Sequence, residues 1–237
     1  MSNASEARSE PKANGVTTAA LRVSWLGSVP YGAALERQLA AIEERRQGGP
    51  DRLLLLEHPP VITLGRSARP QHLRVTRADL AARGVELFEV ARGGDVTWHG
   101  PGQLVGYLIA DLAARGTPDV TAWLRGIEAA LIEALGELGV AARRVDGMTG
   151  VFLEKDDPRG ARLKIASIGV GLRGWISWHG FALNVTTAPG AFADIVPCGL
   201  SGVAMTSLAE ALDARRTPAL FERTREAVAA AFRRRLS

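Results

Sequence analysis

The sequence predicts a single α/β domain, built from a mixed β-sheet with helices on its flanks. Apolar, strand-like runs recur along the chain, and only a few helical stretches interrupt them. No internal repeat or break in composition divides the 237 residues into two units, and the hydrophobic content of 46% is ordinary for a globular core. Residues 1–19 are polar with little to bury, so we expect a disordered leader there and one folded domain over 20–237.

The first half of the chain predicts four short strands and two helices. A helix over 31–47 carries an apolar stripe and ends at Gly48-Gly49-Pro50. A shorter helix is expected between Thr76, a good N-cap, and Gly84, which suits a C-terminal turn. The strands expected here lie at 21–26, 53–56, 61–64 and 85–90, and the second of them is apolar enough to be buried on both faces.

The second half predicts further strands and the clearest helix of the chain. Thr117-Pro118 predicts its start, since proline suits the first helical position, and Gly139 ends the apolar stripe that follows. Thr206 and Thr217-Pro218 predict the starts of the last two helices. The strands expected here lie at 104–109, 140–141, 149–154, 163–171 and 177–185.

The composition excludes several classes of protein. No apolar run approaches the ~20 residues of a membrane span and no signal pattern is present, so we expect a soluble cytoplasmic protein. The net charge of +4 comes without a basic block or interleaved aromatics, which argues against nucleic acid and favours a local patch for an acidic protein partner. One cysteine excludes an internal disulfide and a cysteine-based zinc site, and the four histidines show no metal-ligand spacing.

Lysine is scarce in this chain, which has 26 arginines and three lysines. Lys12 lies in the polar leader and Lys155 in a polar turn, whereas Lys164 lies inside the apolar run 163–168. Arginine stays charged at every relevant pH, but lysine can lose its proton when water is excluded. A lysine in that apolar run therefore indicates a need for an amine that can act as a base.

A glycine-rich run at 92–104, RGGDVTWHGPGQL, separates the strand-like segments 85–90 and 104–109. It holds four glycines, a proline and a histidine in thirteen residues. Glycine permits backbone angles that a Cβ forbids and lets a ligand come close to the main chain. The run therefore predicts either a pocket walled by main-chain atoms or a plain hairpin in which the glycines serve turn geometry.

The single cysteine, Cys198, lies between Pro197 and Gly199, which together favour a turn with the thiol at its tip. Most free cysteines are small buried hydrophobic residues. A nucleophilic cysteine needs a nearby base or cation to form its thiolate, and Lys164 is the candidate. From the residues alone, both interpretations of Cys198 stay open.

Three separated motifs, in order, resemble the signatures of the lipoyl(octanoyl) transferases, which are octanoyl-acyl-carrier-protein:protein octanoyltransferases. They are RGGDVTWHGPGQL at 92–104, KIASIG at 164–169 with HGFALN at 179–184, and IVPCG at 195–199 with TSL at 206–208. The resemblance covers roughly residues 20 to 213. It implies the mixed-sheet fold that this family shares with biotin and lipoate protein ligases, so that 20–237 would be one octanoyltransferase catalytic domain.

The resemblance also implies roles for particular residues. Cys198 would be the nucleophile that carries the acyl group as a thioester, and Lys164 would activate it. Asp95 stands where the family usually has Gln or Lys. The apolar side chains suit an eight-carbon acyl chain, and neither a cofactor nor a metal is implied. The substrate-binding residues implied are Arg92, Gly93, Gly94, Asp95, Val96, Thr97, Trp98, His99, Ser167, Ile168, Gly169, Gly180, Phe181 and Ala182.

Such an enzyme would transfer an octanoyl group from octanoyl-acyl carrier protein to a specific lysine of apo lipoyl domains, in E2 subunits and in the glycine cleavage H protein. This would be the first step of endogenous protein lipoylation. It would need no ATP, because a thioester is already activated. We expect a monomer without a membrane partner, and Arg66 and Arg69 near the pocket loops suit an acidic carrier protein.

His99 and His179 are rival bases, because most catalytic thiol–base pairs use histidine. Each is followed by glycine, so each also suits a structural hydrogen bond in a turn. The stretch GVGLRG at 169–174 matches the GxGxxG of dinucleotide sites. That fingerprint needs a helix after it, and the sequence over 175–181 is strand-like, which argues against a dinucleotide.

Two other functions stay open. An ATP-dependent lipoate or biotin protein ligase on the same fold also carries a lysine near this sheet, but it needs no Pro-Cys-Gly thiol, and the sequence shows no clear nucleotide loop. A non-catalytic protein that binds acyl groups or lipoyl domains would tolerate loss of Cys198, whereas the transferase would not.

Overall fold

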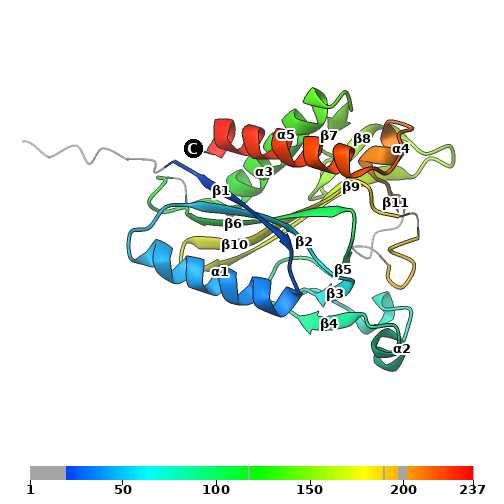
Figure 1. Cartoon of the computed structure of the whole chain (residues 1–237), viewed down its shortest axis with the longest axis horizontal. Helices are drawn as coiled ribbons and strands as arrows, with labels where there is room; N and C mark the ends of the chain where they lie inside the picture. Colours follow the sequence, from blue (N-terminus) through cyan, green and yellow to red (C-terminus); the bar gives the residue numbers. More distant parts are fainter. Residues whose placement is uncertain (1–19, 117, 189, 197–201, 237) are drawn as a thin grey trace, which may run out of the picture.

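The computed structural model describes residues 20–116, 118–188, 190–196 and 202–236 (Figure 1). Its main sheet contains β1 (Arg22–Ser28), β2 (Arg52–Glu57), β6 (Gln103–Asp111), β7 (Ala142–Arg143), β8 (Val151–Asp156), β9 (Arg162–Arg173), β10 (Ile176–Asn184) and β11 (Val203–Met205). The order is β1-β2-β6-β10-β9-β8-β7, with β11 against β9. The pairs β1–β2 and β9–β11 are parallel and the others antiparallel, so the predicted mixed sheet is confirmed.

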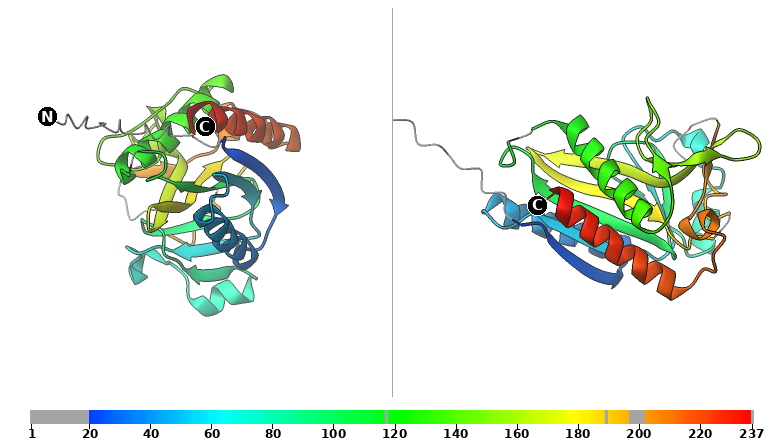
Figure 2. Two further views of the ribbon diagram at one scale, coloured as in Figure 1. Left: turned by 90° about the vertical axis from the view of Figure 1, so that its left-hand side faces the viewer. Right: turned by 90° about the horizontal axis from the view of Figure 1, so that it is seen from above.

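Helices cover both faces of this sheet, and Figure 1 shows α1 (Tyr31–Arg46) below it and α5 (Pro218–Leu236) above it. α3 (Val120–Glu137) lies beside α5 on the upper face, as the right-hand view of Figure 2 shows. β2 and β6 are buried on both faces, because successive side chains of a strand point to opposite sides. In β6, for example, Leu108 joins the core under α3 and α5, whereas Tyr107 joins the core over α1.

A second, three-stranded sheet has the order β4-β3-β5 and contains β3 (Val61–Leu64), β4 (Glu86–Glu89) and β5 (Val96–His99). The short helix α2 (Arg77–Ala82) packs against it. The hairpin interpretation of the run 92–104 is therefore wrong. The run contains a strand of its own, and the strands on either side of it belong to different sheets. The physical reason is a third core cluster, in which Val96 and Trp98 pack against Ile62.

The helix starts agree with the sequence only in part. Thr76 caps α2 with a reciprocal Asp79 contact, and α5 begins at Pro218, both as predicted. α3 begins at Val120, two residues after the predicted start, because the Asp119 carboxylate accepts two main-chain N–H groups, from Thr121 at 2.7 Å and Ala122 at 3.1 Å.

The helix α4 (Leu208–Ala211) likewise begins one residue later than Thr206 predicts. Ser207 is its cap, with Glu210 completing the capping box. Three elements were not predicted: β5, β11 and the 3₁₀ helix η1 (Pro70–His72). Each is only three or four residues long, too short to show a periodicity. The leader predicted for 1–19 lies outside the described residues.

Candidate active site

Lys164 lies on β9, which pairs here with β8 on one side and β11 on the other, and the residue is 3% exposed. Its Nζ donates a hydrogen bond to the main-chain carbonyl of Thr149 at 3.0 Å. The same nitrogen lies 5.5 Å from the centroid of the Phe152 ring, within the range of a cation–π contact. The apolar run around Lys164 therefore folds as a buried strand that places an amine against a main-chain oxygen.

Gly150 makes this close contact possible. Its φ is +131°, which residues with a Cβ rarely adopt. A Cβ built at Gly150 would lie 2.6 Å from Lys164 Cε and 2.6 Å from the carbonyl oxygen of Ala166. The main chain at 149–150 therefore packs directly against the Lys164 side chain.

The glycine-rich run lies over β9 at the other side of the site. Gly93 donates its main-chain N–H to the carbonyl of Val170 at 2.9 Å, and a Cβ at Gly169 would lie 2.8 Å from the carbonyl oxygen of Gly93. Arg92 is buried, and its guanidinium donates to the main-chain carbonyl and to Oγ1 of Thr63. The run therefore forms a wall of main-chain atoms, held in place by a buried arginine.

A cavity of about 210 Å³ lies between this wall and the main sheet. Of the fourteen substrate-binding residues that the sequence implies, thirteen line it. They are Arg92, Gly93, Gly94, Asp95, Val96, Thr97, His99, Ser167, Ile168, Gly169, Gly180, Phe181 and Ala182. Lys164 lines the same cavity, so the structure brings three separated parts of the sequence together around one space.

Trp98 is the exception among these residues, because it does not line the cavity. Its ring lies 5.5 Å from that of Phe192, within the third core cluster. His99, the next residue of β5, lines the cavity instead. The sequence motif does not show which of these two side chains packs in the third core cluster.

Asp95 lies in the cavity wall, but its carboxylate is engaged elsewhere. One oxygen accepts the main-chain N–H of Val96 at 2.7 Å, and the other contacts the imidazole of His72. Both contacts of the carboxylate are therefore to the protein itself.

The opposite end of the cavity contains Tyr31, Tyr107, His99 and His179. His58 lies behind them, donating from Nδ1 to the carbonyl of Val29 at 2.6 Å and meeting the Tyr107 hydroxyl at 2.7 Å. Burial lowers the pKa of His58 to about 4 and that of His99 and His179 to about 3. These histidines are therefore neutral at pH 7 and too weakly basic to serve as general bases.

His179 is also remote from Lys164. It pairs with Val170 on β9, six residues along the strand from Lys164, which corresponds to about 20 Å at 3.3 Å per residue. Its φ of 58° is in the left-handed region, and among the described residues neither ring nitrogen has a hydrogen-bond partner. This geometry leaves Lys164 as the stronger candidate for the base.

Several cavity residues were missed by sequence reasoning. They are Tyr31, Val105, Tyr107, Gly147, Met148 and Thr149, and His179 was expected to be either a base or a structural hydrogen-bonding residue. Tyr31 is the first residue of a helix, and Tyr107 lies in the middle of a buried strand. Neither position indicates a functional site in the sequence. Met148 lies in a turn, and only the glycines at 147 and 150 marked that segment as unusual.

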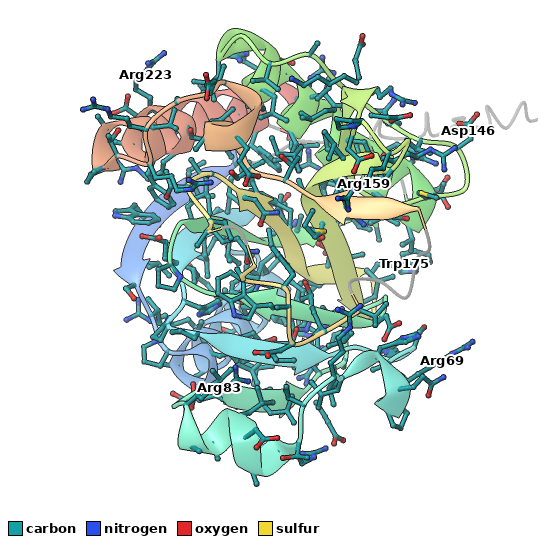
Figure 3. The ribbon with its side chains drawn as sticks, turned by 90° about the vertical axis from the view of Figure 1, so that its right-hand side faces the viewer. Arg69, Arg83, Asp146, Arg159, Trp175 and Arg223 are labelled. Carbon is teal, nitrogen blue, oxygen red and sulfur yellow. The ribbon has the colours of Figure 1, made fainter. Side chains whose placement is uncertain are left out.

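Cys198 lies outside the described residues, so its contacts are not part of this geometry. The described residues on either side of it make strand contacts, and those that follow it reach Lys164. Ile195 forms an isolated bridge with Leu73, and β11 runs parallel to β9 with Met205 opposite Lys164. Arg66 and Arg69, predicted to face a carrier protein, are exposed, and Figure 3 shows Arg69 extending away from the body of the protein.

The part of the chain that the structure describes has no cluster of three or more His, Cys, Asp or Glu that could hold a metal ion. Within that same part, no helix has the length and apolar character to cross a bilayer.

Comparison with known proteins gives consistent relatives. The family model of the lipoyl protein ligase A/B catalytic domain matches residues 30–233. An octanoyltransferase of Chloroflexus aurantiacus is 47% identical over 205 residues, which are 85% of this chain and 88% of that protein. An octanoyltransferase of Koribacter versatilis is 46% identical over 190 residues, 79% of this chain and 74% of that protein.

The solved structures that match are similar in fold. A bi-partite lipoate protein ligase from Thermoplasma acidophilum has a TM-score of 0.67 at 19% identity, covering 92% of this chain and 84% of that one. A lipoate-protein ligase A solved with ATP has a TM-score of 0.65 at 18% identity, covering 93% and 86%. At such identities the likeness shows the fold alone, and it confirms the ligase-like mixed sheet that the sequence predicts.

Proposed function

The chain belongs to the lipoyl protein ligase A/B catalytic-domain family, with octanoyltransferases as relatives at 46–47% identity, and from this premise we propose how it transfers octanoyl groups in protein lipoylation. The donor is octanoyl-acyl carrier protein, and the acceptor is a lysine of an apo lipoyl domain in the cytoplasm. Cys198 carries the acyl group in between. The observation that carries this assignment is Lys164, a buried amine in the wall of a cavity of acyl size.

The first half-reaction loads the enzyme. The Lys164 amine takes the proton of the Cys198 thiol, and the thiolate attacks the carbonyl carbon of the octanoyl thioester. The bond between that carbon and the carrier's sulfur breaks, and the departing sulfur takes the proton from Lys164. The octanoyl group is then a thioester of Cys198.

The second half-reaction transfers the octanoyl group from the enzyme to the acceptor. The neutral ε-amine of the acceptor lysine attacks the carbonyl carbon of octanoyl-Cys198, the carbon–sulfur bond breaks and an amide forms. The proton lost by the attacking amine passes through Lys164 to the Cys198 sulfur. No ATP is consumed, because the acyl group stays activated as a thioester until the amide forms.

The position of the chain around Cys198 supports this pairing. Cys198 precedes β11 by five residues, a span of at most about 18 Å when extended, and Met205 of β11 pairs with Lys164. The residues before Cys198 are held by the Ile195–Leu73 bridge. The β11 anchor therefore limits how far the thiol can lie from the Lys164 amine.

The cavity supports an acyl substrate. A cavity of about 150 Å³ binds benzene, a ring of six carbons. The 210 Å³ found here is larger in about the proportion that an eight-carbon chain requires. Ile168 and Phe181 provide apolar walls, and the neutral histidines place no charge at the far end.

An ATP-dependent ligase is the second candidate, favoured by the fold of the solved structures. Two observations argue against it. Such a ligase needs no Pro-Cys-Gly thiol, which this sequence contains at Cys198. The relatives at 46–47% identity are octanoyltransferases, so the transferase is the better supported function.

Intact-protein mass spectrometry after mixing with octanoyl-acyl carrier protein, without ATP, tests the proposal. We expect an octanoyl adduct that peptide mapping places on Cys198, that hydroxylamine releases, and that an apo lipoyl domain discharges. The Cys198→Ser variant should show neither the hydroxylamine-labile adduct nor transfer. Transfer that needs ATP and free octanoate would establish the ligase, and no transfer under either condition would leave a binding protein.

A further inference from the structure

The loop over residues 144–150 holds Lys164 from one side. Thr149 supplies the carbonyl that accepts the Nζ hydrogen bond, and Gly150 brings the main chain against Cε. Gly147, Met148 and Thr149 of this loop also line the cavity. The direction in which the lysine amine points therefore depends on where this loop is held.

One side chain of α3 holds both ends of the loop. Oε1 of Glu128 accepts the main-chain N–H of Gly150 at 3.1 Å. Oε2 accepts from the guanidinium of Arg144, at the start of the loop, at 3.0 Å and from that of Arg125 at 2.7 Å. Arg144 also donates to the main-chain carbonyl of Arg125 at 2.7 Å, which ties the loop to α3 a second time.

The burial of this carboxylate is unusual for the helix that carries it. The Glu128 side chain is 0% exposed, and taking a carboxylate out of water costs several kcal/mol. Glu133, on the same helix, pairs with Arg234 and Arg235 of α5 and keeps a side chain that is 24% exposed. A contact that served helix packing alone could be apolar or exposed, whereas the Glu128 carboxylate is aimed at one main-chain amide beside Lys164.

We propose that Glu128 is a positioning residue for the transfer reaction, acting on Lys164 through the amide of Gly150 and the carbonyl of Thr149. The inference rests on the proposed role of Lys164 as the base. Glu128 touches neither substrate nor thiol. Glu128 holds the amide of Gly150 in place, and this positions the carbonyl of the preceding residue, Thr149. Because that carbonyl accepts one hydrogen bond from the Lys164 amine, it sets the direction of the amine's lone pair or remaining protons.

Three variants test the proposal. Glu128→Ala removes the acceptor of the Gly150 amide and should lower kcat about 30-fold with KM for the octanoyl donor unchanged, in the range seen when groups that orient a reactive residue are lost. Glu128→Gln keeps an oxygen for the Gly150 amide and should restore kcat to within a few-fold of the native value. Glu133→Ala, the matched control on the same helix, loses two ion pairs and should leave kcat unchanged.

Amide hydrogen exchange over residues 145–152 gives a readout that does not depend on catalysis. Glu128→Ala should exchange faster there, and Glu128→Gln should stay protected. Native kcat in Glu128→Ala would overturn the proposal, as would native protection of this segment. Equal loss of kcat in Glu128→Gln would assign the effect to the charge and overturn the role of the hydrogen bond.

A fourth variant covers the case in which Glu128→Ala fails to fold. Gly150→Ala leaves Glu128 in place but puts a Cβ where Lys164 Cε lies, so it should lower kcat in the same way. Native kcat in a folded Gly150→Ala would overturn the proposal. Failure of the base role itself is distinguishable, because an active Lys164→Arg enzyme would remove that role while the exchange of Gly150 still reports on Glu128.

Discussion

The two ends of the cavity both bury basic side chains, but they do so in different ways. At one end the Lys164 amine donates a hydrogen bond to a main-chain carbonyl and lies over the Phe152 ring. At the other end burial holds the pKa of His58, His99 and His179 at about 3 to 4. Register along β9 separates Lys164 from His179 by about 20 Å.

This difference teaches that burial alone does not identify a catalytic base. A histidine with a pKa near 3 stays neutral across the physiological range and serves as an aromatic wall and a hydrogen-bonding group. The main chain of His179 is strained, with φ at 58°, and this strain is a cost of shaping that wall. What a buried basic group contacts decides its chemistry: the Lys164 amine donates to a main-chain oxygen, whereas among the described residues neither ring nitrogen of His179 has a hydrogen-bond partner.

Lys164→Arg should have the largest effect, and it tests the lysine end of the cavity directly. Arginine keeps the positive charge but cannot act as a base, so kcat/KM for octanoyl transfer should fall by about 10⁴-fold. Quantifying octanoylated lipoyl domain by mass spectrometry measures this. Lys155→Arg, a substitution at an exposed lysine of β8, is the matched control and should keep full activity. Substantial activity in Lys164→Arg would show that charge suffices at this end.

Acid should destabilise the protein through the histidine end. The unfolded chain protonates each histidine near its ordinary pKa of 6.5, whereas burial keeps these three neutral down to about pH 4 or 3 in the folded state. The unfolded state therefore binds more protons below pH 6.5, and the free energy of unfolding falls as the pH falls. We expect about 1.4 kcal/mol per pH unit for each histidine, or about 4 kcal/mol together at pH 5.5.

Urea unfolding at pH 7.5 and 5.5 measures this loss. His179→Asn removes one titrating group, and asparagine tolerates a positive φ, so the loss should shrink by about a third. An unchanged pH dependence in that variant would mean that His179 has the same pKa in the folded and unfolded states, and the contrast between the two ends would disappear.

Ile168→Ala tests the apolar wall between the two ends and should have the smallest effect. Removing methyl and methylene groups that contact the acyl chain should weaken its binding by about 1.4 kcal/mol, a tenfold rise in KM for the octanoyl donor. Trp98→Phe is the control, since Trp98 lies outside the cavity and should affect stability only. A matching rise in KM for Trp98→Phe would place that ring at the substrate after all.

The sequence by itself determined the elements and the candidate chemistry. Apolar runs and alternation located the strands of the main sheet apart from β11, and the helix over 31–46 follows from its stripe, because both patterns are local and repeat within a few residues. The scarcity of lysine singled out Lys164, and the motifs predicted the family and most of the residues that line the cavity. The pairing of Lys164 with Cys198 stays a prediction, because it depends on residues outside the described part.

Only the tertiary structure decided which residues share the cavity and how they are held. Tyr31 and His179 are far apart in the chain, and they line one space because α1 packs across β10. Trp98 lies outside the cavity because its ring packs in the third core cluster, against Phe192. Glu128 reaches Gly150 because α3 covers the strand that follows. Such contacts join elements that local patterns describe separately, since packing and burial act across the chain rather than along it.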